Sequence, residues 1–343
     1  YSEIVALAQV LPGPASSQVG FAVGWTQRRL PGALAAFVGF TVPSALLLAG
    51  FGALVSTTDV SGAAWLTALK IVAVAVVLDA VLGMGRSLAS TRRTATIAIA
   101  TFVAILLVPL PLMQVGALVL AGLVGSLLFA DPAARGPRAL PLTVSPRWGV
   151  AALVAFVTLL VAVPLVAGVG PLAELAAIHY RAGALVFGGG HVVLPLLEAP
   201  MVPELMDSST FLAGYGMAQA VPGPLFTVAA YLGQVVAGPA GAAVAIVAIF
   251  TPGFLLLVGV LPFWARIRAN TRVQAALVGV NAAVVGVLAA ALYDPIVVTT
   301  LLGPLEVAYA AVLFAALHVW KAPPWAVVIG AVLASPLLTI LGG

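Results

Sequence analysis

Long apolar runs limit what this chain of 343 residues can fold into more than any other feature. The runs are about 17–25 residues long, the length that a helix needs to span the hydrocarbon core of a bilayer. They are rich in Leu, Val, Ala and Gly and have no alternating polar face of the kind that barrel strands show. Only 7% of the residues are charged, against about 25% in soluble domains. We therefore predict an all-α polytopic membrane protein.

The composition also excludes several kinds of chemistry. The chain has no cysteine for a disulfide or a thiolate-metal site, and its three histidines (His179, His191 and His318) lack the spacing of metal ligands. We expect no metal, no cofactor and no enzymatic activity, because the sequence also lacks a nucleophile–base pair and an acidic metal cluster. The net charge of +4 comes mostly from short arginine groups between apolar runs. That pattern is typical of cytoplasmic loops and not of nucleic-acid binding.

Two matching motifs interrupt the apolar runs: "AQVLPGP" at 8–14 and "AQAVPGP" at 218–224. Proline ends a helix, glycine permits a sharp turn, and a second proline suits the first position of a new helix. The new helix presents free N–H groups and about half a positive charge, which favours an anion. The alternative is a pair of kinks satisfied by neighbouring helices. The candidate ligands are Gln9, Pro12, Gly13, Pro14, Ser16, Ser17 and Gln18 around the first motif, and Gln219, Pro222, Gly223, Pro224 and Thr227 around the second.

A third interruption is the glycine run in "LVFGGGHVVLPLL" at 185–197. Gly188, Gly189 and Gly190 can expose backbone N–H groups as an anion-binding concavity. His191 can add a donor that depends on protonation. The alternative is a close helix crossing through small residues, with His191 bonded to a carbonyl.

Ionisable residues inside apolar runs are functional candidates, because burying a charge in a bilayer costs several kcal/mol. Asp79 lies two turns before Arg86 and is a candidate for coupling or proton handling, the alternatives being a structural salt bridge or an aqueous vestibule. Lys70 lies near the other end of that run, where it can snorkel. Arg181 can supply positive charge to an oxyanion or mark a helix end, and Glu198 is similarly ambiguous.

The two halves repeat the same order of features. After each Pro-Gly-Pro motif comes a proline in a matching context, Pro43 in "TVPSALLLAG" and Pro252 in "FTPGFLLLVG". We therefore divide the chain into a first repeat at 1–130, with an N-terminal helix expected before Tyr1, a linker and connecting helix at 131–170, and a second repeat at 171–343. About twelve apolar segments result, some of them only half-crossings.

The arginines predict opposite orientations for the two repeats. In the first half, arginines occur in the first and third loops after the broken helix but not in the second. In the second half, they occur in the second of these three loops and not in the other two. If basic loops face the cytoplasm, equivalent helices run in opposite directions. Inverted repeats with discontinuous helices are typical of transporters, and the site lies near mid-membrane between the halves.

The chain resembles the chromate ion transporter family. The resemblance rests on "LAQVLPGPASSQVGFAVGW" and "PGALAAFVGFTVPS" in the first half, and on "FGGGHVVLPLLEAPMV", "MAQAVPGPLFTVAAYLG" and "IFTPGFLLLVG" in the second. It implies two homologous halves of opposite orientation in the bacterial inner membrane, and export of chromate from the cytoplasm. Family members commonly have a Gly-Gly-Pro helix before the first Pro-Gly-Pro, the counterpart of "FGGGH". Many relatives have an aromatic residue where this chain has His191.

The sequence thus predicts an inner-membrane transporter that exports chromate by alternating access and binds the oxyanion at the broken-helix N-termini. A sulfate or other oxyanion permease is the alternative, because sulfate has the same charge and shape. A membrane-embedded enzyme acting on lipid phosphates is a less favoured one. The expected partners are the oxyanion and the lipid bilayer, without nucleic acid, and a homodimer stays open.

Overall fold

The computed structural model describes residues 2–58, 63–108, 113–129, 144–187 and 189–342. Helices and their connecting loops make up all of these described residues, without a strand. Among them, five helices are long and apolar enough to cross a membrane: Ala15–Thr57, Ala64–Leu88, Pro146–Leu165, Leu225–Ala269 and Thr271–Thr300. The remaining apolar helices are shorter. The prediction of an all-α polytopic membrane protein is confirmed.

The helices of the first half follow the apolar runs closely. They are α1 (Ser2–Val10), α2 (Ala15–Thr57), α3 (Ala64–Leu88), α4 (Arg92–Leu107) and α5 (Met113–Leu128), and α6 (Pro146–Leu165) connects the halves. Proline at the first position of α6 suits a helix start, because that N–H has no helical partner in any case.

The second half is divided more finely than the apolar runs indicate. It contains α7 (Pro171–Leu185), α8 (Val193–Met201), α9 (Ser208–Ala218), the 3₁₀ turn η3 (Leu225–Thr227), α10 (Val228–Val260), α11 (Trp264–Ala269) and α12 (Thr271–Ala291). A π-helical turn at Leu292–Val297 leads into α13 (Val298–Thr300), followed by α14 (Pro304–His318), α15 (Pro324–Ala334) and α16 (Pro336–Gly342). The run at 171–199 is therefore two helices, α7 and α8, that pack against each other.

Helices α2 and α10 each contain one sharp turn, and the two turns have nearly the same backbone geometry. In α2 the turn is Arg28 (φ −139°, ψ 28°) and Arg29 (φ 50°, ψ −139°). In α10 it is Ala237 (φ −143°, ψ 27°) and Gly238 (φ 63°, ψ −157°). Each helix is thus a short arm and a long arm. The turns fall where the sequence separates apolar segments.

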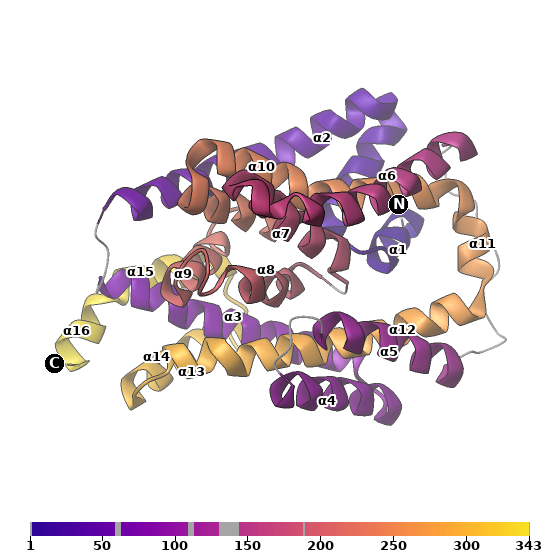
Figure 1. Ribbon diagram of the computed structural model, residues 1–343. Helices are drawn as coiled ribbons and strands as arrows, with labels where there is room; N and C mark the ends of the chain where they lie inside the picture. Colours follow the sequence, from indigo (N-terminus) through magenta and orange to yellow (C-terminus); the bar gives the residue numbers. More distant parts are fainter. Residues whose placement is uncertain (1, 59–62, 109–112, 130–143, 188, 343) are drawn as a thin grey trace.

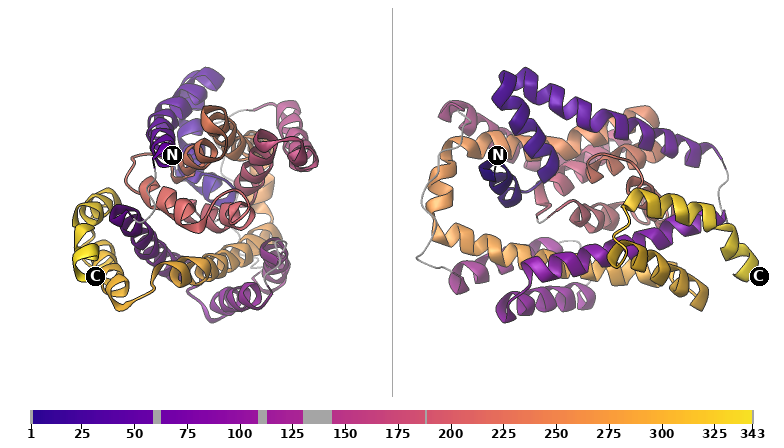
Figure 2. Two further views of the ribbon diagram at one scale, coloured as in Figure 1. Left: turned by 60° about the vertical axis from the view of Figure 1, so that its left-hand side comes forward. Right: turned by 180° about the vertical axis from the view of Figure 1, so that it is seen from behind.

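Two layers of helices face each other in Figure 1, with α8 and α9 between them. The upper layer holds α1, α2, α6, α7 and α10, and the lower layer holds α3, α4, α5 and α12 to α14. The long arm of α2 leads to the end of the molecule that holds the C-terminus, whereas the long arm of α10 leads to the opposite end, where α11 lies (Figures 1 and 2). Helices α3 and α12 also run in opposite directions.

Aromatic side chains hold α2 and α10 together in the upper layer. Phe37 meets the rings of Phe250 and Phe254 edge-on, at centroid distances of 5.1 and 5.0 Å. Phe21, on the short arm of α2, stacks on Phe254 at 4.5 Å. Because lipid tails are as apolar as these side chains, close packing and not the hydrophobic effect stabilises such contacts inside a membrane. This packing places the two Pro-Gly-Pro breaks next to the long arms.

Candidate functional site

The first Pro-Gly-Pro break lies between α1, which ends at Val10, and α2, which begins at Ala15. Gly13 has φ +114°, a conformation that a residue with a Cβ rarely adopts. Its N–H donates to the carbonyl oxygen of Val186 at 2.8 Å, just before the glycine loop. No side chain of the described residues caps the start of α2 at Pro14, so the first-turn N–H groups are not satisfied by a cap.

The side chain of Gln18 links this break to helix α10. Its side chain is fully buried, and Nε2 donates to the carbonyl oxygens of Pro12 at 2.9 Å and Gly253 at 3.0 Å. An amide nitrogen has only two N–H groups, so Gln18 has none left for an anion. The sequence predicts Gln18 as a ligand of the anion; in the structure both of its N–H groups bind backbone carbonyl oxygens.

The second break extends from the end of α9 to η3 and packs against α2. Gly223 has φ +152°, and a Cβ built on it would lie 2.8 Å from the Cβ of Ser44. The first break mirrors this contact, because a Cβ on Gly13 would lie 2.9 Å from the Cα of Gly253. Each break therefore rests on the proline-containing long arm of the other half, next to Pro43 or Pro252. The sequence does not single out Ser44 and Gly253 as contact residues, because the neighbouring prolines only indicate a repeat.

The glycine loop joins both breaks. Gly189 has φ +136°, and a Cβ on Gly190 would lie 3.3 Å from the Cβ of Leu225, the first residue after the second break. The bond from Gly13 to Val186 connects the loop to the first break. Gly188 lies outside the described residues. Three non-helical segments from distant parts of the sequence thus meet at one place.

A short polar chain runs from the glycine loop to the second break. His191 Nδ1 and the hydroxyl of Tyr215 are 2.8 Å apart, and Gln219 follows at the end of the same helix, α9. Within the described part of the chain, the buried Nε2 of Gln219 has no hydrogen-bond partner. Sequence reasoning missed Tyr215, although it lies one helical turn before Gln219, where two side chains share a face.

The hydroxyl groups near the breaks differ in what they can still bind. Thr227 donates its proton to the carbonyl oxygen of Pro224 at 2.7 Å, so that proton is not offered to a ligand. The hydroxyl of Ser17 is buried and has no partner among the residues described here. Ser16 is exposed, and so is Gln9 on α1.

A cavity lies at the second break. It has a volume of about 210 Å³, is lined mainly by residues 218–225, including Gln219 and Gly223, and has Trp325 of α15 on its other side. This cavity is smaller than the pockets of about 300–1,000 Å³ that hold drug-sized ligands, and its size suits a small ion. A second cavity, of about 280 Å³, is lined mainly by α11 and α12 and reaches the first break only at Val10.

A family model described as the chromate transporter matches residues 1–126 and 173–335. The chain belongs to the chromate transporter family. A chromate transport protein of Pseudomonas aeruginosa is 29% identical over 311 residues, covering 86% of this chain and 71% of that protein. A chromate transport protein of Cupriavidus metallidurans is 26% identical over 305 residues, covering 85% and 71% of the two chains. No solved structure matches the chain.

Membership of the chromate transporter family makes the chain a multi-pass membrane transporter for an anion. The family is one of transport proteins and not of enzymes. The alternative of a membrane enzyme acting on lipid phosphates is therefore set aside.

Asp79 forms an ion-pair contact within this transporter. Its Oδ1 lies 2.7 Å from Nδ1 of His318, which is 239 residues away in the sequence. On the other side of the imidazole, Nη1 of Arg86 lies 3.4 Å from Nε2 of His318. The Asp79 side chain is 40% exposed. Asp79 and Arg86 thus contact the two different ring nitrogens of His318.

The other three charged candidates differ in their surroundings. Lys70 donates to the hydroxyl of Ser209 at 3.1 Å and so ties α3 to the first turn of α9. Arg181 is exposed near the end of α7. Glu198 on α8 is only 4% exposed, and both of its carboxylate oxygens lack a partner within the described ranges. A buried carboxyl without a partner favours its protonated form.

Proposed function

We propose that this protein exports chromate from the cytoplasm across the inner membrane by alternating access between two inverted repeats. The observation that carries the proposal is the meeting of the two Pro-Gly-Pro breaks with the glycine loop. The bound oxyanion lies between the first turns of α2 and of the η3–α10 segment. The relatives named as chromate transport proteins support chromate as the substrate.

The proposed site recognises the anion without a fixed positive charge in contact with it. Two helix starts each contribute about half a positive charge and several N–H groups. The unpartnered Nε2 of Gln219 and the hydroxyl of Ser17 are the side-chain donors that remain available. Together they match a tetrahedral ion with two negative charges. Because none of these donors carries a full positive charge, the anion can also dissociate, which transport requires.

Three features support the inverted repeats. The turns in α2 and α10 have nearly equal dihedral angles, equivalent long arms run in opposite directions (Figure 1), and the family model matches the chain in two separate segments. A pair of helices related in this way can rock against each other around a fixed site.

The experiment that tests the function is flux of radiolabelled chromate into proteoliposomes that contain the purified protein. We expect saturable uptake that responds to an imposed pH gradient or membrane potential, with protein-free liposomes as the control. Unlabelled sulfate is added as a competitor, because these hydrogen-bond donors distinguish anions by their charge and shape and not by their central atom. Flux of labelled sulfate with no flux of chromate would replace chromate by sulfate in the proposal, and no flux of either would overturn it.

A further inference from the structure

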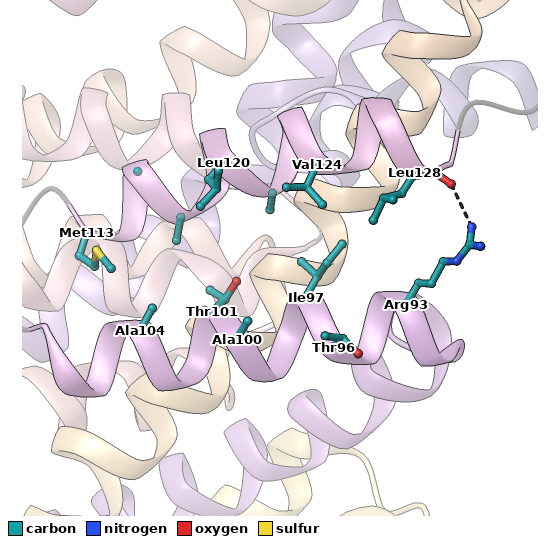
Figure 3. A pocket seen from close by; sticks show the side chains of 13 residues that line it. Arg93, Thr96, Ile97, Ala100, Thr101, Ala104, Met113, Leu120, Val124 and Leu128 are labelled. Carbon is teal, nitrogen blue, oxygen red and sulfur yellow. Dashed lines mark hydrogen bonds between the residues drawn. The ribbon is translucent and has the colours of Figure 1, made fainter.

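A long apolar groove runs between α4 and α5, away from the proposed anion site. Its volume is about 510 Å³. Small side chains such as Ala100, Ala104 and Ala117 form its walls, and Figure 3 shows Arg93 at one end and Met113 at the other. None of the residues proposed to bind chromate lines this groove.

The groove exists because α4 and α5 both pack on α12 and touch each other only weakly. Helix α5 crosses α12 where the glycines Gly125 and Gly279 face each other, and a Cβ on Gly125 would lie 2.9 Å from the Cα of Gly279. Helix α4 packs on α12 where the Ala98 carbonyl contacts Gly286. Two helices held separately on a third leave an open space between them. The space is open to the surroundings of the protein, since Leu120 in its lining is 62% exposed.

The length of the groove suits an acyl chain. Its lining extends along α4 from Arg93 to Ala104, about 17 Å at 1.5 Å per residue. The length is close to the depth of one leaflet, about half of the 30 Å hydrocarbon core.

A positive charge marks one end of this groove. Arg93 uses Nη1 to donate to the carbonyl oxygen of Leu128 at 3.1 Å, as the dashed line in Figure 3 shows. Its other guanidinium N–H groups have no partner in the described part of the protein, and the neighbouring Arg92 is exposed. Guanidinium groups bind phosphate through several parallel hydrogen bonds. Basic groups at the cytoplasmic end of a space between membrane helices are typical of sites for anionic lipid head groups.

We propose that the α4–α5 groove binds an anionic phospholipid, with an acyl chain along the groove and its phosphate on Arg93. Arg92 adds attraction for a net negative head group, which distinguishes this lipid from a zwitterionic one. The bound lipid covers the faces of α4 and α5 that α12 leaves open.

Native mass spectrometry tests the proposal directly. The purified protein is reconstituted in nanodiscs of equimolar phosphatidylcholine and phosphatidylglycerol, released, and the retained phospholipids are counted. We expect the unaltered protein to retain phosphatidylglycerol in preference. Ala117→Trp fills the groove and should lower that retention at least tenfold. Arg93→Gln should reduce the preference for phosphatidylglycerol by about tenfold, as the loss of one charge-assisted hydrogen bond predicts.

Matched controls use the exposed face of α6. Ala151→Trp and Arg147→Gln make the same changes at exposed positions and should leave retention unaltered. Equal retention by Ala117→Trp and the unaltered protein would overturn the proposal, as would a lack of preference for the anionic lipid. A dimer that Ala117→Trp dissociates would show that a second copy occupies the groove. Because lipid retention is measured without transport, its failure is distinguishable from failure of the chromate proposal.

Discussion

Gln18 and Gln219 carry the same side chain, one near each Pro-Gly-Pro motif, yet their amide N–H groups have different partners. Gln18 spends both N–H groups on the carbonyl oxygens of Pro12 and Gly253. Gln219 keeps a buried Nε2 without a partner among the described residues and lines a cavity. A buried donor without a partner costs about 1–3 kcal/mol, which a bound anion would recover. At the scale of single residues, Gln219 is therefore the better candidate ligand.

Asp79 provides a test of coupling at the same scale. Asp79→Asn keeps the shape of the side chain next to His318 but removes the charge that faces His318. If Asp79 handles protons, chromate flux should lose most of its dependence on pH. The KM for chromate should change less than about twofold, because Asp79 is not among the proposed ligands.

Proteoliposome flux measured at a series of pH values checks this expectation. Glu204→Gln, which neutralises an exposed carboxylate, is the control and should keep the original pH profile. An unchanged profile in Asp79→Asn would leave the contact with His318 as a structural ion pair.

At the scale of elements, each broken segment is held by the long arm of the other half. The break before η3 contacts α2 at Ser44, and the break before α2 contacts α10 at Gly253. An alternating-access motion that moves one half against the other must therefore change both contacts together. We therefore expect substitutions at the contact between a break and the long arm to reduce transport.

Gly223→Ala tests that contact. An added Cβ would lie 2.8 Å from the Cβ of Ser44, and the φ of +152° at Gly223 adds about 1–3 kcal/mol of strain for a residue with a side chain. We expect chromate flux to fall at least tenfold. The double substitution of Gly223→Ala with Ser44→Gly removes the steric contact and should recover part of that loss.

Flux and thermal unfolding of the purified variants measure this effect. Gly39→Ala on the same α2 is the control, because a Cβ there meets no atom within 4 Å. Undiminished flux in a folded Gly223→Ala variant would place the anion site elsewhere.

At the scale of the whole molecule, the basic residues and the directions of the helices agree. Arg28 and Arg29 form the turn of α2, and Arg266 and Arg268 lie on α11. The long arm of α2 runs away from its arginine turn, whereas the long arm of α10 runs toward α11 (Figure 2). Under the positive-inside rule, both arginine pairs face the cytoplasm when the repeats are inverted.

Cysteine labelling tests this arrangement, and the natural sequence without cysteine gives a clean background. We expect single cysteines in Ser90→Cys and Ala269→Cys to react with a membrane-impermeant maleimide only after bacterial cells are permeabilised. Those in Thr58→Cys and Leu302→Cys should react in intact cells. Thr58 and Ala269 follow equivalent arms, so labelling of both from one side would mean that the repeats are parallel.

The sequence by itself determined the membrane class and the helical fold. These properties are local: an apolar run of sufficient length must satisfy its backbone groups within a helix, and a proline removes a donor wherever it stands. The ends of α1 and α9 at the Pro-Gly-Pro motifs, and the turns in α2 and α10, all fall at interruptions visible in the apolar runs.

Only the tertiary structure decided what the polar groups bind. Asp79 meets His318 across 239 residues, and Gln18 meets Gly253 across 235. No local sequence pattern predicts either contact, because a hydrogen bond between distant helices depends on which helices pack together and in which register. The groove between α4 and α5 has the same origin, since it follows from how both helices sit on α12. In this transporter the sequence marks where the chain breaks, and the packing determines which of the buried donors near the breaks keep a free N–H or O–H group.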